Sequence, residues 1–335
     1  MATVGGAGSG QIYTSADFGA SWTPRESARN WQSVASSSDG SKLVAAVYFG
    51  QLHISTDLGI TWTQHDSIRQ WRAVASSSDG SKLVAAEGGN GFIYTSTDSG
   101  VSWTQRPSSG GRLWQSVASS ADGSKLVAVA YNDNLSTSSD SGVTWTARES
   151  VIYWKAVASS ADGNKLVAAA EGAGGQLFTS TNSGASWTPR VSSRTWASVA
   201  SSTDRSRLAA VADNAQIYMS SDFGVGWTAS ETSRRWTAVA SSADSIRVVA
   251  AEQGMVGPGG GGLLYTSVPA VNTFASSTTV GVTGYLTGPQ RSAIELQYIG
   301  SGQFMPLCYV GTISSYKAGR LTTLCRTSAD CGLTP

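Results

Sequence analysis

One octapeptide, Ser-x-Asp-x-Gly-x-(Ser/Thr)-Trp, constrains the fold of this chain more than any other feature. It occurs six times, with Asn182 in place of Asp in the fifth copy and Gly226 in place of Ser/Thr in the sixth. The copies begin at Ser15, Ser55, Ser96, Ser138, Ser180 and Ser220. They end at Trp22, Trp62, Trp103, Trp145, Trp187 and Trp227, which lie 40 to 42 residues apart. A second tryptophan follows nine residues later, or eleven in the third copy, at Trp31, Trp71, Trp114, Trp154, Trp196 and Trp236. A fixed period of this length indicates a repeat architecture in which each unit packs on its neighbours.

Each repeat contains four short segments that have the pattern of β-strands. Between Trp31 and Trp62 these are WQSVASS, KLVAAV, QLHIS and TWTQ, separated by Ser-Asp-Gly, by a glycine-containing loop and by the octapeptide. Short alternating strands joined by Asp-Gly turns are typical of antiparallel hairpins. Four such strands per repeat predict the blade of a β-propeller, because a solenoid with one strand per coil would need a period nearer about 20 residues.

We therefore expect an all-β fold: a β-propeller of four-stranded antiparallel blades with a small C-terminal β extension. With the strands of a blade named A to D from the second tryptophan onward, seven blades are favoured over six, because six would leave segment 263–267 without a place. Residues 1–270 are assigned to the propeller, and residues 271–335 to a C-terminal β segment. That segment is expected partly to complete the closing blade and partly to form an appended β-hairpin unit around Ser301 and Gly302. The disulfide state of Cys308, Cys325 and Cys331 stays open.

The octapeptide resembles the Asp-box, or BNR repeat, of the sialidase-like β-propellers, and the resemblance covers residues 10 to 267. In that family the box is the turn between the third and fourth strands of a blade. Turn carboxylates accept backbone N–H groups, and glycine supplies the left-handed conformation that such turns need. We therefore expect a structural role for the box residues Asp17, Asp57, Asp98, Asp140, Asn182 and Asp222.

The resemblance does not extend to the sialidase catalytic residues. Sialidases carry an Arg-Ile-Pro motif, a tyrosine nucleophile paired with a glutamate, an aspartic acid and three non-equivalent arginines, whereas no Arg-Ile-Pro occurs here. The arginines of this chain are equivalent copies, and a catalytic site needs singular groups at a defined separation. We expect no catalytic residue, and a sialidase-like hydrolase or lyase is the third of three hypotheses.

Composition narrows the classes of partner and cofactor. The formal net charge is +1, which predicts no general attraction to nucleic acid. No apolar run is long enough for a transmembrane segment. The only histidines are His53 and His65, so no metal site is expected, and the glycine-rich start has no following helix to cradle a phosphate. No cofactor is therefore expected.

Candidate binding residues repeat in the D–A loops. One series stands two residues before the second tryptophan, interrupted only by Ile152, and another stands three residues after the box tryptophan, where the second copy has His65. They are Arg29, Arg69, Arg112, Arg194 and Arg234, and Arg25, Arg106, Arg148 and Arg190. Guanidinium groups bind carboxylate, sulfate or phosphate bidentately, and an arginine beside a tryptophan makes a platform for a sugar. The second-series tryptophans therefore join the candidate ligand-binding set.

Two interpretations of these arginines remain open. Each could pair with acidic residues of the same loops, namely Glu26, Asp66, Glu149 and Glu231, or of the B–C loops, namely Glu87, Glu171, Asp213 and Glu252. Otherwise the face they share is a binding surface, because loops on a rigid scaffold are where binding usually resides. We predict a non-catalytic, lectin-like or adhesin-like module for a glycan or an anionic surface polymer, with a protein-interaction scaffold as the alternative. The C-terminal hairpin is loosely similar to the β-rich tips of fibre proteins, so an extracellular or cell-surface location is expected.

Overall fold

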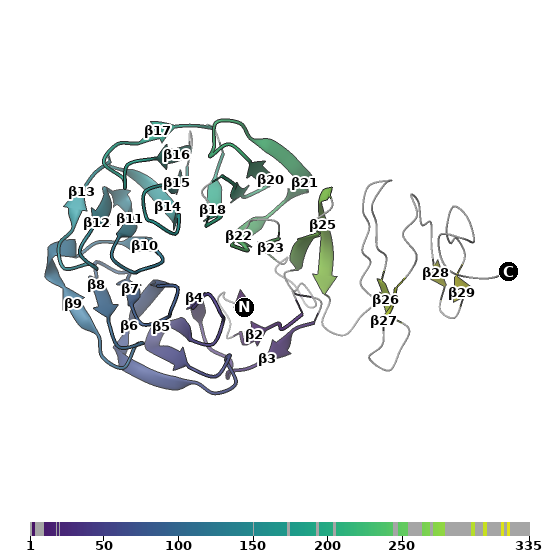
Figure 1. The fold of residues 1–335 in the computed structure, drawn as a ribbon, viewed down its shortest axis with the longest axis horizontal. Helices are drawn as coiled ribbons and strands as arrows, with labels where there is room; N and C mark the ends of the chain where they lie inside the picture. The colour runs from purple at the N-terminus through teal and green to yellow at the C-terminus, as the bar shows by residue number, and fades with distance from the viewer. Residues whose placement is uncertain are drawn as a thin grey trace.

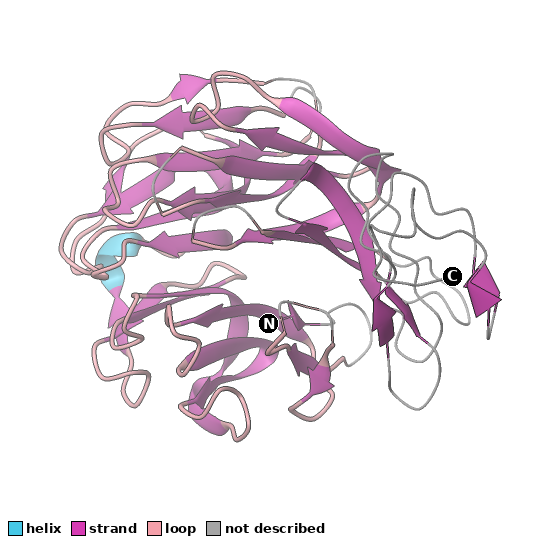
Figure 2. Cartoon of the chain, turned by 45° about the vertical axis from the view of Figure 1, so that its right-hand side comes forward, coloured by secondary structure: helices cyan, strands magenta, loops and turns pink. Residues whose placement is uncertain are grey.

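The computed structural model describes residues 2–3, 10–17, 19, 21–149, 151–172, 175–191, 194–203, 206–243, 247–253, 263–268, 271–278, 296–298, 304–306, 316–317 and 320–321. Within these ranges the chain is almost entirely β-strand, with one 3-10 turn, η1 (Pro107–Ser109). Figure 1 shows the strands arranged in a ring around a central axis. Figure 2 shows the sheets following one another around that ring. The predicted β-propeller is confirmed.

A four-stranded antiparallel sheet is the repeating unit. The clearest example contains β18 (Trp196–Ser201), β19 (Leu208–Ala212), β20 (Ala215–Ser220) and β21 (Thr228–Arg234), hydrogen-bonded in that order. The first strand lies nearest the axis and the last lies at the rim (Figure 1). We name each sheet by the second-series tryptophan of its inner strand, so this one is the Trp196 sheet.

The other sheets follow the same plan. The Trp236 sheet is β22 (Trp236–Ser241), β23 (Val248–Glu252), β24 (Leu264–Val268) and β25 (Val271–Thr278). The Trp154 sheet is β14 (Ile152–Ser159), β15 (Leu166–Ala170), β16 (Leu177–Ser180) and β17 (Thr188–Pro189), and the Trp114 sheet is β10 (Trp114–Ser119), β11 (Leu126–Asp133), β12 (Leu135–Ser138) and β13 (Thr146–Ala147). The Trp31 and Trp71 sheets are built from β4 (Trp31–Ser36), β5 (Leu43–Ser55), β6 (Thr63–Ser76), β7 (Leu83–Glu87), β8 (Ile93–Ser96) and β9 (Thr104–Arg106).

Two strands are longer than the repeat pattern predicts. β5 runs through both the second and the third strand positions of the Trp31 sheet, and Phe49 within it has a positive φ of 55°. β6 forms the outer strand of that sheet and continues as the inner strand of the Trp71 sheet, pairing with β5 and then with β7. The loops at this point pair with each other, Tyr48 with Gln70 and Gly50 with Arg69, so the backbone stays extended between sheets.

The chain ends carry the remaining strands. β1 (Ala2–Thr3), β2 (Ile12–Thr14) and β3 (Thr23–Pro24) form a three-stranded sheet. At the C-terminal end β26 (Leu296–Tyr298) pairs with β27 (Phe304–Pro306), and β28 (Tyr316–Lys317) pairs with β29 (Arg320–Leu321). The described residues contain no fourth strand for the sheet of β1 to β3. The number of blades, seven rather than six, therefore stays a prediction. The three cysteines lie outside the described residues.

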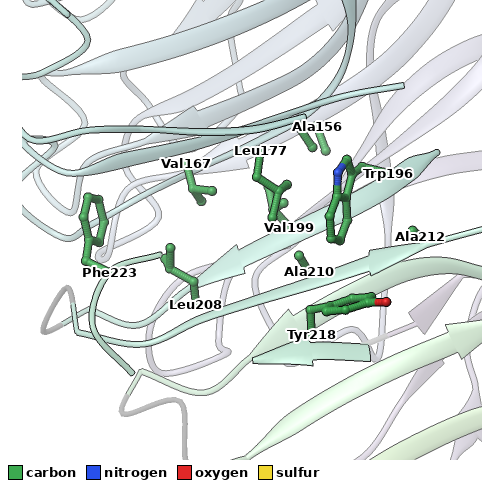
Figure 3. Close-up of a cluster of buried hydrophobic side chains, with 11 residues drawn as sticks. Ala156, Val167, Leu177, Trp196, Val199, Leu208, Ala210, Ala212, Tyr218 and Phe223 are labelled. Atoms are coloured by element: carbon green, nitrogen blue, oxygen red, sulfur yellow. The ribbon is translucent and has the colours of Figure 1, made fainter. Parts of the chain in front are cut away.

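The core lies between neighbouring sheets. In Figure 3, Trp196, Leu208 and Tyr218 of one sheet lie in the same cluster of buried side chains as Val167 and Leu177 of the preceding sheet. In all six sheets that begin with a second-series tryptophan the register between the first two strands shifts directly after that residue, for example between Trp196 and Ser198. A β-bulge of this kind re-aims a side chain. The burial of these tryptophans is therefore built into the strand pairing.

Hydrogen bonds join neighbouring sheets, and a close approach brings the sheet of β1 to β3 against the Trp236 sheet. The backbone N–H of Ser38 donates to the carbonyl of Ser78 (2.7 Å), and that of Ser78 donates to the carbonyl of Ala121 (2.7 Å) in the next sheet. A Cβ added to Gly19, in the first box, would lie 3.0 Å from Thr266 Cγ2 in β24. The first sheet therefore contacts the last.

No helix in the described part of the chain is long and apolar enough to cross a membrane.

Candidate functional site

The box aspartates hold their own turns. In the second copy Asp57 accepts the backbone N–H of Thr61 (2.9 Å) and the hydroxyls of Thr61 (2.6 Å) and Ser55 (2.8 Å). These bonds, the Thr61 hydroxyl first and then its backbone N–H, lower the pKa of Asp57 to about 2 because they favour the charged form. Trp62 Nε1 donates to the Gly59 carbonyl (3.0 Å), so the indole closes the same turn. The bonding capacity of these carboxylates is committed to the fold.

The second-series tryptophans lie in the core rather than at a surface. Trp31, Trp71, Trp114, Trp154, Trp196 and Trp236 are each 0 to 1% exposed. Most of them meet an aromatic residue of the third strand edge to face, as Trp71 does with Tyr94 at 5.1 Å and Trp236 with Tyr265 at 5.0 Å. A ligand on the loop face would therefore meet the groups that cover these indoles and not the indoles.

The arginines before those tryptophans are the covering groups. Arg69 Cζ lies 4.5 Å from the Tyr94 ring centroid, and its nitrogens lie 3.9 Å from Asp66 and 3.8 Å from Glu87. Arg112 pairs with Asp133 (3.2 Å), Arg234 with Glu252 (3.4 Å) and Arg29 with Glu26 (3.8 Å). Arg194 lies over Tyr218, its Cζ 4.5 Å from the ring centroid, and its Nε donates to the tyrosine oxygen (2.6 Å). This series is thus bound within the blades by ion pairs and cation–π contacts.

The repeat that lacks this arginine supplies its cation from another position. Ile152 occupies the arginine position, and Glu171 of the same sheet pairs with Lys155 at 2.9 Å instead. In the Trp196 sheet Asp213 pairs with Arg235 (3.4 Å), which belongs to the following repeat. The charges before the second-series tryptophans and in the B–C loops are thus neutralised locally.

The outer arginines are held differently. The Nε groups of Arg25, Arg106, Arg148 and Arg190 each donate to a threonine hydroxyl of the neighbouring strand, namely Thr14, Thr95, Thr137 and Thr179, at 2.6 to 2.9 Å. Among the described residues no carboxylate lies within 4.0 Å of these four side chains. The terminal nitrogens of this series remain available to a ligand.

The loop face also exposes large apolar and aromatic side chains that repeat analysis did not single out. Tyr131 and Tyr153 are 39% and 47% exposed, and their rings lie 5.0 Å apart. Strand pairing brings them together, since Tyr131 of β11 is opposite Tyr153 of β14. Phe49 (64% exposed) and Leu113 (39% exposed) lie in loops of the same face. Each stands where the repeats differ, so only departure from the consensus could have drawn attention to it.

One cation of this face bridges three sheets. Arg72 follows Trp71, and its terminal nitrogens donate to Gln32 Oε1 (2.9 Å) and Gln115 Oε1 (3.3 Å) on the two neighbouring inner strands. In the described part of the chain Arg72 has no carboxylate partner. Arg72 is thus a half-buried hydrogen-bond donor among the inner strands. The repeat pattern did not predict it as a site residue.

His53 is the most strongly perturbed base. It is 2% exposed, stands where other sheets have tyrosine, and meets Trp31 edge to face at 4.8 Å. Burial, together with the positive charge of Arg29, lowers the pKa of His53 from 6.5 to about 4.

No group of three His, Cys, Asp or Glu side chains in the described ranges could hold a metal ion.

No protein-family model matches this chain, and no curated protein sequence matches it. Solved structures do. A GH74 enzyme of Niastella koreensis superimposes with a TM-score of 0.65 at 16% identity, over 92% of this chain and 57% of that one. The xyloglucanase of Xanthomonas campestris gives 0.59 at 16% identity, over 80% and 50%. YCF48 bound to D1 peptide gives 0.57 at 16% identity, over 84% and 91%.

The comparisons bear on the fold alone, because all identities are low. This chain spans little more than half the length of the first of these enzymes. β-Propellers among its structural neighbours include enzymes and a peptide-bound protein. The likeness establishes for this chain the fold that its repeats predict, a β-propeller.

Proposed function

We propose that this protein is a non-catalytic, lectin-like binding module that holds a glycan on the loop face of its propeller. One observation carries the proposal: Tyr131 and Tyr153 are both exposed, and their rings lie 5.0 Å apart where the Trp114 sheet meets the Trp154 sheet. The C–H face of a sugar packs on such rings, and its hydroxyls need nearby polar groups. Arg72 and its glutamine partners supply those groups on the same face.

The charges of the face support binding rather than catalysis. Seven carboxylates of the D–A and B–C loops each have a cation within 4.0 Å, namely Glu26, Asp66, Glu87, Asp133, Glu171, Asp213 and Glu252. Glycoside hydrolysis needs one carboxyl group protonated and a second at a set distance from it. These seven carboxylates are engaged in ion pairs within the blades, which supports a binding role for the face over a catalytic one. We expect the module to act outside the cell or at its surface. Residues 1–270 are the propeller, and residues 271–335 are a C-terminal β segment that partly completes the closing blade, as β25 does in the Trp236 sheet, and is partly an appended hairpin unit.

A glycan array tests this function. Wild type should bind a defined set of glycans, and Tyr131→Ala/Tyr153→Ala should lose at least about fivefold in affinity, since two aromatic contacts contribute about 1–3 kcal/mol together. The matched control is Ile60→Ala, which removes a 59% exposed side chain from a box turn and should bind as wild type does. Equal binding by the double variant would refute the assignment of this face.

A protein-interaction scaffold is the second candidate. It is favoured by the likeness to YCF48 bound to D1 peptide and by the exposed Phe49 and Leu113, because aromatic and apolar side chains are enriched at protein interfaces. A pull-down with the same variants separates the two functions. No glycan hit, together with a single tight protein partner lost in the tyrosine double variant, would replace the lectin proposal with this one.

A further inference from the structure

A cavity of about 110 Å³ lies between the Trp114 sheet and the Trp154 sheet, away from the tyrosine pair. Its lining includes the cations Lys125 and Arg148, the amide of Asn182 and the hydroxyls of Thr137 and Ser183. No carboxylate is among the described residues that line it. We name it the interblade pocket.

Among the described residues, neither cation of the interblade pocket has a carboxylate within 4.0 Å. Arg148 Nε donates to Thr137 Oγ1 (2.9 Å), and its two terminal nitrogens have no carboxylate partner among the described residues. Lys125 Nζ donates to Asn164 Oδ1 (2.5 Å) and to Ser183 Oγ (3.3 Å), which are both uncharged acceptors. Two positive charges therefore face one cavity whose lining contains no carboxylate.

The nearest acidic turn residues are occupied by their own turns. Asp140 accepts the hydroxyl of Ser138 (2.8 Å) and both the backbone N–H (2.9 Å) and the hydroxyl (2.6 Å) of Thr144. Asp162 accepts the hydroxyl of Ser160 (2.7 Å) and the backbone N–H of Asn164 (3.1 Å). Both carboxylates thus bond within their own turns, and neither residue lines the pocket.

The repeat motif departs from its pattern at this pocket. Five copies of the box have aspartate at the third position. Residues of two copies line the pocket, and the second of these copies has Asn182 in place of the aspartate. Asn182 keeps the turn, because its Oδ1 accepts the backbone N–H of Ser186 (2.9 Å), but it brings no negative charge. The corresponding groove between the Trp71 and Trp114 sheets, lined by Lys82 and Thr95, has a volume of only about 10 Å³. The pocket is thus larger than the corresponding groove between the two preceding sheets, and one of its two boxes lacks the usual carboxylate.

We propose that the interblade pocket binds one small tetrahedral oxyanion, sulfate or phosphate, either free or as an ester on a larger molecule. A volume of about 110 Å³ exceeds that of three water molecules at about 30 Å³ each, which is enough for the four oxygens of such an ion. Arginine and lysine side chains with several hydroxyl donors are the groups that bind phosphate and sulfate oxygens. The site is separate from the proposed glycan face and does not depend on it.

Isothermal titration calorimetry with sodium sulfate, and separately with inorganic phosphate, tests the proposal. Sodium chloride keeps the ionic strength constant, so that general screening does not mimic binding. Wild type should bind one anion per chain, and Arg148→Gln should bind it about tenfold more weakly, as expected for the loss of a charge-assisted hydrogen bond. The matched control is Arg106→Gln, which removes the equivalent arginine beside the small groove and should leave the affinity unchanged.

Asn182→Asp is the sharper variant, because it restores the residue found in the other five boxes. Its thermal unfolding temperature should equal or exceed that of wild type, while its affinity for the anion should fall at least about tenfold from the added negative charge. Wild-type affinity in Asn182→Asp, or no saturable binding of either anion by wild type, would overturn the proposal. Titration with N-acetylglucosamine 6-sulfate and with its unsulfated form then names the source: binding of the sulfated sugar alone assigns the pocket to an ester, and binding of inorganic anion alone assigns it to the free ion.

Discussion

Replacing His53 by tyrosine should remove a specific pH dependence from the stability of this protein. The imidazole is buried in the Trp31 sheet at a position that holds Tyr94, Tyr218 and Tyr265 in other sheets. Its pKa is lowered from 6.5 to about 4, chiefly by burial. Between these two values the unfolded chain binds a proton that the folded chain does not. The free energy of unfolding therefore falls as pH decreases from about 6.5 to about 4, and this contribution changes no further below that range.

The magnitude follows from the size of the pKa shift. A difference of about 2.5 pKa units corresponds to about 3 kcal/mol in full, because one unit is about 1.4 kcal/mol. Integrated only from pH 7 to pH 5, the same linkage amounts to about 2 kcal/mol. The box aspartates Asp57 and Asp98, with pKa values lowered to about 2 by hydrogen bonds within their turns, contribute stability that is lost only at lower pH. The pH 7 to 5 interval therefore isolates the histidine.

Reversible urea unfolding at pH 7 and pH 5 measures the effect. Wild type should lose about 2 kcal/mol more than His53→Tyr over this interval. The difference between the two pH values cancels any constant cost of fitting the larger ring. His65→Gln, which replaces the only other histidine, is the control and should keep the wild-type loss. Equal losses in wild type and His53→Tyr would refute the reasoning.

Three further variants test the packing. Trp196→Ala should lower the free energy of unfolding by about 3–5 kcal/mol, because removing the fully buried indole leaves a cavity between sheets. Urea unfolding measures this loss. A smaller loss than that caused by Trp187→Ala, at a half-buried position, would contradict the prediction. Gly184→Ala should destabilise more than Gly40→Ala in the same assay, since both have positive φ (81° and 73°) but only the first places a Cβ 2.7 Å from Thr137 Cγ2. Arg69→Gln should reduce stability by about 1 kcal/mol through its lost ion pairs and its lost contact with Tyr94. On the glycan array Arg69→Gln should bind as wild type does, and weakened binding without loss of stability would return this arginine to the binding site.

Most of the fold could be predicted from the sequence because its determinants are local and repeated. The box turn is built from residues within eight positions, as Ser55, Asp57 and Thr61 show by bonding to one another. The spacing of the tryptophans predicts the repeating four-stranded sheet, and the alternation of apolar and polar residues within each segment predicts its strands. The joined strands β5 and β6 could not be foreseen, because they depend on pairing between loops of different repeats, such as Tyr48 with Gln70.

The candidate site could be predicted only as a face. Periodicity drew attention to the arginines that every repeat shares, and shared residues are the ones that the blade itself uses, as the contacts of Arg69 with Glu87 and Tyr94 show. Four residues on which the two proposals rest stand where the repeats differ, namely Tyr131, Tyr153, Arg72 and Asn182, whereas Lys125 and Arg148 of the pocket are repeated residues. These residues come from different repeats, and a single sequence does not show how close they lie to their neighbours in space.

The sequence by itself determined the propeller, because turn chemistry and strand alternation act over a few residues and are written six times. The tertiary structure decided which charges are satisfied. Arg69 and Arg148 belong to equally regular series, yet Arg69 has carboxylates beside it and Arg148 has a cavity. Ion pairing depends on distances of a few ångströms between separate strands, and only the packed ring of sheets sets those distances.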